Sequence, residues 1–209
     1  MDKSNYVCSC QAQDLFCDLE LYIDSCSLEI RLLLFKHIVI KKWKIPKNEL
    51  ILSWVSTIEH SPNYQGSRSF IGFMLLDGSV IVLPMLDLIW WGFPEYVREY
   101  IKVIKVYRAI IEEVISIGAI GMSGTKEYGI DIPGRYYGLS FSLSDAKKYK
   151  KWLSQIYNET KQPGDNPEDV YTRMKENNIQ GKLLDKLQND GFIYNRKYTW
   201  DKVYKRENE

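Results

Sequence analysis

The sequence predicts a mixed α/β domain of the α+β kind, followed by a small C-terminal tail. Three observations predict this: an Asp-Gly pair between two apolar β-type runs within residues 70–83, an amphipathic helical pattern over 94–114, and a polar stretch over 158–167. Asp-Gly between apolar runs is the strongest local signal for a β-hairpin, and the polar stretch, with two prolines and a glycine, is typical of a linker. We therefore divide the chain into a domain (1–157), a linker (158–167) and a tail (168–209).

The composition is that of an ordinary globular protein. The chain has 209 residues, of which 45% are hydrophobic and 26% charged. These fractions exclude a largely disordered or low-complexity chain. The formal net charge of +1 argues against a protein that coats nucleic acid through its overall charge, because such domains are usually strongly basic.

The apolar segments are too short to span a bilayer, which takes about 20 consecutive apolar residues. No signal-peptide core follows the N-terminal methionine. We therefore predict a cytoplasmic protein with no membrane partner. The four cysteines (Cys8, Cys10, Cys17 and Cys26) lie close together, but their spacing matches no common zinc site, and we expect them to be reduced thiols.

Strands dominate the prediction for the first half of the domain. Residues 19–24 form a β-type run, while 28–43 and 50–58 are apolar segments that their periodicity leaves open between helix and strand. The hairpin follows, with arms over 70–76 and 79–83. Both arms are apolar throughout, which predicts a central place in a sheet covered on both faces.

The second half begins with the helical pattern over 94–114, whose first residue is a proline and whose apolar residues recur along one face. Small residues over 115–121 predict a core strand, and 139–143 alternate like a strand or a strand–helix junction. Ser142 or Ser144 is the expected cap of the last helix of the domain.

The tail is predicted to contain two helices and a hairpin, which together resemble part of a winged helix. Asn166 and Pro167 are typical of a helix start, a second helix is expected over 181–189, and a hairpin over 192–200. The basic residues of the tail are balanced by acidic ones. A DNA-reading winged helix is normally more one-sided in charge, so DNA binding through the tail is kept only as an alternative function.

Two aspartates are the candidate metal ligands. Asp24 ends a β-type run and is followed by the small residues Ser25, Cys26 and Ser27, and Asp77 lies at the hairpin tip. If the strand of Asp24 lies beside the hairpin, the two carboxylates converge and could hold Mg²⁺ or Mn²⁺, which in turn hold a nucleoside triphosphate. A helix starting near Ser27 would turn its N–H groups toward the phosphates. The alternative is that both are simply turn residues, and spacing alone favours it.

The order of these elements resembles the catalytic domain of class III nucleotidyl cyclases over residues 18–157. Four motifs carry the resemblance: Tyr22-Ile23-Asp24-Ser25-Cys26-Ser27-Leu28 for the first metal aspartate, Leu76-Asp77-Gly78 for the second, Ser116-Ile117-Gly118-Ala119-Ile120-Gly121 for a later strand, and residues 135–146 for the segment that follows. The resemblance implies a ferredoxin-like, palm-type fold with a central antiparallel or mixed sheet covered by helices.

The resemblance also implies a function. The chain would convert a nucleoside triphosphate to a 3′,5′-cyclic mononucleotide and pyrophosphate, with Mg²⁺ or Mn²⁺ held by Asp24, Ser25 and Asp77. Ser25, Cys26 and Ser27 would contact the substrate. Class III sites form between two protomers, so a homodimer is implied.

The chain departs from the family at the residues that act on the phosphates. The family's asparagine falls on Ser142 and its arginine on Ala146. Lys147 or Lys148 would have to supply the missing cation, although lysine does not reproduce the fork of an arginine.

In adenylyl cyclases a lysine before the hairpin tip and an aspartate before the later glycine read the base. Here these positions hold Phe73 and Arg135, and neither residue preserves the hydrogen-bonding pattern of that pair. Arg135 is instead a candidate phosphate contact. Two explanations fit: the base is not adenine, as in the bacterial antiphage pyrimidine cyclases of the Pycsar type that use UTP or CTP, or the domain is an inactive module that binds a nucleotide or a protein.

Overall fold

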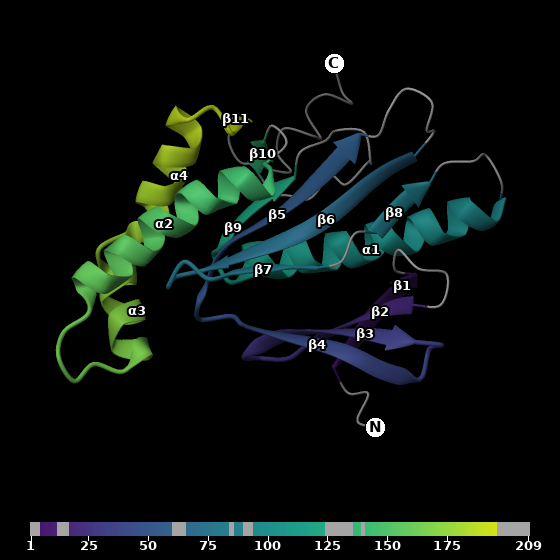
Figure 1. Cartoon of the computed structure of the whole chain (residues 1–209), viewed down its shortest axis with the longest axis horizontal. Coiled ribbons are helices and arrows are strands. Elements are labelled where there is room, and N and C mark those ends of the chain that lie inside the picture. The colour runs from purple at the N-terminus through teal and green to yellow at the C-terminus, as the bar shows by residue number, and fades with distance from the viewer. Residues whose placement is uncertain are drawn as a thin grey trace, which may run out of the picture.

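The computed structural model describes residues 5–11, 17–59, 66–83, 86–89, 94–123, 136–138 and 141–195. These residues form a mixed α/β fold, as the sequence predicts, but the strands form two sheets and not the single central sheet that was expected. Figure 1 shows the layers: helix α1 (Pro94–Ser116) lies between the two sheets, and three further helices lie on the other side of the larger sheet.

The first sheet is a four-stranded antiparallel meander of β1 (Tyr6–Gln11), β2 (Cys17–Ile23), β3 (Ser27–Leu34) and β4 (Ile38–Pro46). The segment 28–43, whose periodicity is compatible with helix or strand, lies in the two strands β3 and β4. The helix expected near Ser27 is wrong, because β3 begins at this residue. Alternate side chains of β2 and β3, such as Leu19, Leu21 and Ile30, are buried in one core with α1, and this period of two is that of a strand.

The second sheet has seven strands in the order β11-β10-β9-β5-β6-β7, with β8 also pairing β6. Their bounds are β5 (Leu50–Glu59), β6 (Gly66–Leu75), β7 (Val80–Val82), β8 (Leu86–Ile89), β9 (Ile120–Ser123), β10 (Tyr136–Gly138) and β11 (Ile193–Asn195). The Asp-Gly hairpin is confirmed as β6 and β7. The central position holds for β6 alone, because β7 ends the strand order and its side chains are half-buried.

The helices begin close to their predicted starts. α2 (Leu143–Thr160) is capped by Ser142, whose side chain accepts a hydrogen bond from the Asp145 N–H, and α3 (Pro167–Glu176) is capped by Asn166. α4 spans Ile179–Asn189.

The strand expected over 115–121 is partly wrong: α1 continues to Ser116, Gly118 turns the chain with a φ of 83°, and β9 begins only at Ile120. In the segment 139–143, residues 141 and 142 are not in a strand, and 139 and 140 lie outside the described residues.

The predicted tail shares its core with the domain. Leu183 and Leu187 of α4 and Met174 of α3 are buried in one cluster with Trp54 of β5 and Leu153 of α2. β11 pairs with β10 and so extends the second sheet. The rest of the hairpin expected over 192–200 lies outside the described residues.

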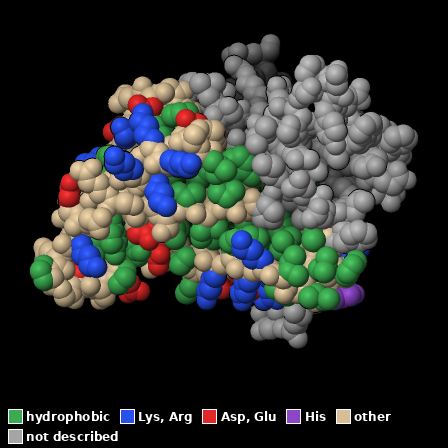
Figure 2. Space-filling model, in the orientation of Figure 1, with side chains coloured by type: hydrophobic (Ala, Val, Ile, Leu, Met, Phe, Trp, Pro, Cys, Tyr) green, Lys and Arg blue, Asp and Glu red, His purple; other side chains and the backbone are tan. Residues whose placement is uncertain are grey.

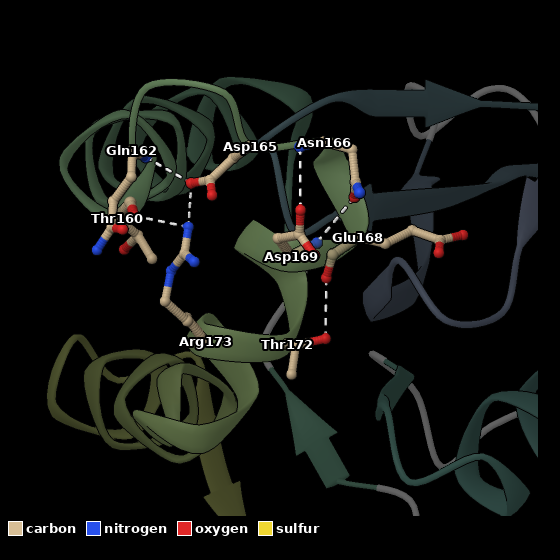
Figure 3. Close-up of polar contacts among 8 residues, drawn as sticks. All are labelled: Thr160, Gln162, Asp165, Asn166, Glu168, Asp169, Thr172 and Arg173. Carbon is tan, nitrogen blue, oxygen red and sulfur yellow. Dashed lines mark hydrogen bonds and ion pairs between the residues drawn. The ribbon is translucent and has the colours of Figure 1, made fainter.

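The predicted linker is a short ordered turn between α2 and α3. Figure 3 shows its contacts: the Arg173 guanidinium donates hydrogen bonds to the Thr160 carbonyl, at 3.3 Å, and to the Asp165 carboxylate. The same carboxylate accepts a hydrogen bond from the Gln162 N–H at 2.5 Å. The Arg173 side chain of α3 thus holds the end of α2. The polar residues of this stretch make hydrogen bonds within an ordered turn and do not form a flexible spacer.

The pair of Trp54 and Gly72 in the second sheet gives a test of this packing. The two residues lie opposite each other on β5 and β6, and a Cβ on Gly72 would come within 2.2 Å of the Trp54 ring. We expect Gly72→Ala to lower the free energy of unfolding by about 1–3 kcal/mol, because the buried indole has to move. Urea unfolding followed by circular dichroism measures the change.

Gly164→Ala is the control for this substitution. Gly164 has a φ of 89° but no atom within 4 Å of an added Cβ, so we expect only the cost of the left-handed backbone, about 1–2 kcal/mol. A Gly72→Ala variant as stable as the parent protein would contradict the packing described above.

Candidate functional site

Asp24 lies in the turn between β2 and β3 of the first sheet. Its Oδ1 accepts hydrogen bonds from the N–H groups of Cys26 at 2.7 Å and Ser27 at 2.6 Å, and its Oδ2 accepts one from the Ser27 hydroxyl at 2.9 Å. These bonds hold the pKa of Asp24 below its usual value. Ser25 and Cys26 are exposed and Ser27 is buried. The arrangement is that of an aspartate that closes a turn on its own backbone.

Asp77 lies at the tip of the β6–β7 hairpin in the second sheet. Its Oδ1 accepts a hydrogen bond from the Ser79 N–H at 2.6 Å, and its Oδ2 accepts one from the Ser79 hydroxyl at 2.8 Å. The Ser154 hydroxyl of α2 donates to the Asp77 carbonyl at 2.9 Å. A Cβ on Gly78 would lie 2.6 Å from the Lys150 carbonyl. Helix α2 therefore packs directly on the hairpin tip.

The strand pairing expected to bring the two aspartates together is not found. Asp24 follows β2 in the first sheet, whereas Asp77 follows β6 in the second, so the strand of Asp24 does not lie beside the hairpin. The carboxylate that Asp77 affects is that of Glu49, whose pKa is raised by burial and then by the charge of Asp77. No group of three or more His, Cys, Asp or Glu side chains within the described residues could hold a metal ion.

The residues expected to read the base and the phosphates serve other purposes. Phe73 is fully buried in the core between α1 and the two sheets, where no ligand reaches it. Ser142 caps α2 through a reciprocal pair of hydrogen bonds with Asp145. Arg135 lies outside the described residues.

Lys147 and Lys148 are exposed on α2, and the structure ties only Lys148 to a partner that is described. Its Nζ lies 3.0 Å from Oδ2 of Asp190, just after α4. The buried Tyr149 hydroxyl donates to the same oxygen at 2.6 Å. These two hydrogen bonds, that from Tyr149 first, lower the pKa of Asp190, and together they fasten α4 to α2.

The structure instead offers a cavity at the end of α1. Its volume is about 380 Å³, within the usual range for small-molecule sites. It lies where the α1–β9 turn and the start of β5 face α3 and α4. Most of its lining is apolar, and the described lining residues are Leu50, Ile51, Leu76, Ile115, Gly118, Ala119, Ile120, Met174, Lys175, Asn178, Gln180, Gly181 and Leu184.

Three polar side chains come from the α3–α4 side of the cavity. Gln180 donates a hydrogen bond from its Nε2 to the Gly118 carbonyl, which ties α4 to the α1–β9 turn. Asn178 has a left-handed backbone, and its Oδ1 accepts from the Gly181 N–H at 3.2 Å. Lys175 is the one charged residue among the lining residues that the structure describes.

A half-buried carboxylate lies beside this region. Glu49 accepts a hydrogen bond from the Tyr171 hydroxyl of α3 at 3.3 Å. Burial raises the pKa of Glu49, and the nearby charge of Lys175 opposes this with a smaller effect. Sequence reasoning did not identify this group. Glu49 and Lys175 come from segments that only the packing of α3 on the second sheet brings together, so no local spacing could reveal them.

Comparison with protein-family models found no match, and comparisons with curated proteins and with solved structures found none either. The resemblance to nucleotidyl cyclases therefore depends on the four sequence motifs alone. None of the described helices combines the length and the apolar character needed to cross a bilayer.

The Tyr149–Asp190 pair predicts a defined pH dependence of stability. The folded-state pKa of Asp190 is lowered, so its contribution is complete above the unfolded pKa, about 4, and is lost as the pH falls through the folded value. Tyr149→Phe removes the principal donor. We expect it to lower the free energy of unfolding by about 1 kcal/mol at neutral pH and by less as the pH falls through the folded-state pKa of Asp190, as measured by urea unfolding over a pH series.

Tyr157→Phe is the matched control, because no hydrogen bond of the Tyr157 hydroxyl is found among the described residues. It should have a small effect that does not change with pH. A Tyr149→Phe effect that persisted unchanged in acid would exclude Asp190 as the partner that matters.

Proposed function

We propose that the chain is a binding module that takes a small amphipathic anion in the cavity between the end of α1 and the α3–α4 pair. The observation that carries the proposal is the distribution of its lining. Apolar side chains from β5, β9 and α1 form one part of the cavity, and Lys175, Asn178 and Gln180 contribute polar groups from the other. A mainly apolar cavity with a few convergent polar groups is the usual form of a small-molecule site.

The charges nearby favour a ligand with a single negative charge. Lys175 supplies the one cation of the described lining, and Glu49, close enough for Lys175 to affect its pKa, adds a negative charge when ionised. A nucleoside triphosphate carries several negative charges and usually needs bound cations or several basic groups. A medium-chain fatty acid or an aromatic carboxylate fits the cavity better, because its apolar body meets the apolar wall and its carboxylate meets Lys175.

Binding of decanoate, measured by displacement of anilinonaphthalene sulfonate fluorescence, tests the proposal. Lys175→Met keeps the apolar stem and removes the charge, and we expect about fivefold weaker binding, equivalent to about 1 kcal/mol. Leu184→Trp fills the cavity from the side of α4 and should abolish binding. Lys182→Met removes an exposed charge from α4 outside the lining and serves as the matched control.

Circular dichroism and thermal unfolding show whether each variant is folded. Binding by the parent protein that neither Lys175→Met nor Leu184→Trp changes would place the ligand elsewhere. Failure of the folded parent protein to bind decanoate or the fluorescent probe would overturn the proposal.

The cyclase activity expected from the sequence stays a separate hypothesis, and it has its own test. The folded protein is incubated with ATP, GTP, CTP or UTP in the presence of Mn²⁺, and the products are separated by chromatography. A binding module forms no cyclic nucleotide. A cyclic product that is lost in a folded Asp77→Ala variant would contradict the binding-module proposal and support an enzyme.

A further inference from the structure

The turn that joins β3 and β4 carries an exposed apolar surface. Phe35 is 57% exposed, Ile38 56% and Ile40 50%, with Val39 exposed between the last two. Figure 2 shows hydrophobic side chains gathered at this end of the first sheet, with basic side chains beside them. We call Phe35, Ile38, Val39 and Ile40 the β3–β4 tip, to distinguish it from the β6–β7 turn that contains Asp77.

The backbone conformation of this turn disfavours the large side chains that it carries at Phe35 and Lys36. Phe35 has a φ of 52° and Lys36 a φ of 65°, both in the left-handed region, and the His37 N–H donates to the Leu34 carbonyl at 3.2 Å. A β-turn with positive φ at both central positions favours Asn and Gly there, because a bulky side chain is strained in this region. The sequence therefore places a large apolar side chain at the outermost point of the hairpin against its local preference, which suggests a selected role.

Lysines surround the β3–β4 tip. Residues 35–44 contain Lys36, Lys41, Lys42 and Lys44 and no acidic residue. All four are exposed. Lys42 is paired with Glu29 at 2.6 Å, and the Lys41 ammonium lies over the Trp43 ring at 4.8 Å from its centroid.

We propose that the β3–β4 hairpin docks on the surface of an anionic phospholipid bilayer. Phe35 and Ile38 enter the boundary between headgroups and acyl chains, and the lysines contact lipid phosphates. Apolar side chains beside a basic surface are the pattern of interfacial binding, and each lysine near an anionic membrane adds to the attraction. This contact needs no spanning segment, so it is a proposal separate from the sequence prediction of no membrane partner, which was based on the absence of such a segment.

A second copy of the chain fits the same surface less well. β4 is one of the two edge strands of the first sheet, and pairing it with another β4 would bring the lysines of both strands together. Lysines on an edge strand are a common means of preventing such pairing. The excess of positive charge is complementary to anionic lipid and unfavourable for self-association.

Sedimentation with vesicles tests the proposal, using phosphatidylcholine alone and phosphatidylcholine with phosphatidylserine. We expect the full chain to bind only the vesicles with phosphatidylserine, and to be released as salt rises from about 0.1 M to about 0.5 M. Phe35→Asn suits the left-handed backbone and removes the apolar ring. Together with Ile38→Ser it should weaken binding at least about tenfold, without loss of thermal stability.

Lys41→Gln with Lys44→Gln tests the charge, with an expected loss of at least about tenfold. The matched controls are Lys151→Gln with Lys161→Gln, which removes two exposed lysines elsewhere, and Ile101→Ser, which removes an exposed isoleucine from α1. The controls should bind as the parent protein does.

Three results would overturn the proposal: no binding to phosphatidylserine vesicles at any salt concentration, equal losses in the control variants, or a monomer–dimer equilibrium that the tip variants abolish while vesicle binding is unchanged. The last result, seen by sedimentation velocity, would assign the β3–β4 tip to a protein interface.

Discussion

The burial of α1 between the two sheets is the constraint on which the rest of the fold depends. Val103, Ile110 and Val114 are buried in a single core together with side chains of β2, β3, β5 and β6. Each sheet turns an apolar face toward the same helix, so neither face is shielded from water without it. The ion pair of Lys47 with Glu113 also joins the connection between the sheets to the last turns of α1.

The second core follows from this arrangement. With one face of the larger sheet on α1, the other face is covered by α2, α3 and α4. This packing places α2 on the β6–β7 turn and explains why Asp77 is held as a turn residue. The proposed ligand cavity lies where the end of α1 and the α3–α4 pair meet the starts of β5 and β9 without filling the space between them.

The α3–α4 pair, which lines the cavity, and the β3–β4 turn lie on opposite sides of the molecule in Figure 1. The first site is a mainly apolar cavity with a single described cation in its lining, and the second is an apolar projection among lysines. The net charge of +1 means that neither depends on the overall field of the protein. Any attraction for an anion is local, because the acidic and basic residues of the chain balance.

The sequence by itself determined the features that are encoded within a few residues. The Asp77-Gly78 turn, the Ser142 and Asn166 caps and the amphipathic pattern of α1 all depend on neighbours in the chain, and the structure contains each of them. The tertiary structure alone decided whether 28–43 is helix or strand, which sheet receives the strand of Asp24, and that Phe73 is core. Strand pairing depends on which distant segments bury their apolar faces together, and a local pattern carries no information about the partner. For this reason the local pattern could not place the strand of Asp24. The cyclase resemblance implied that it lies beside the hairpin of Asp77, whereas packing around α1 separates the two into different sheets.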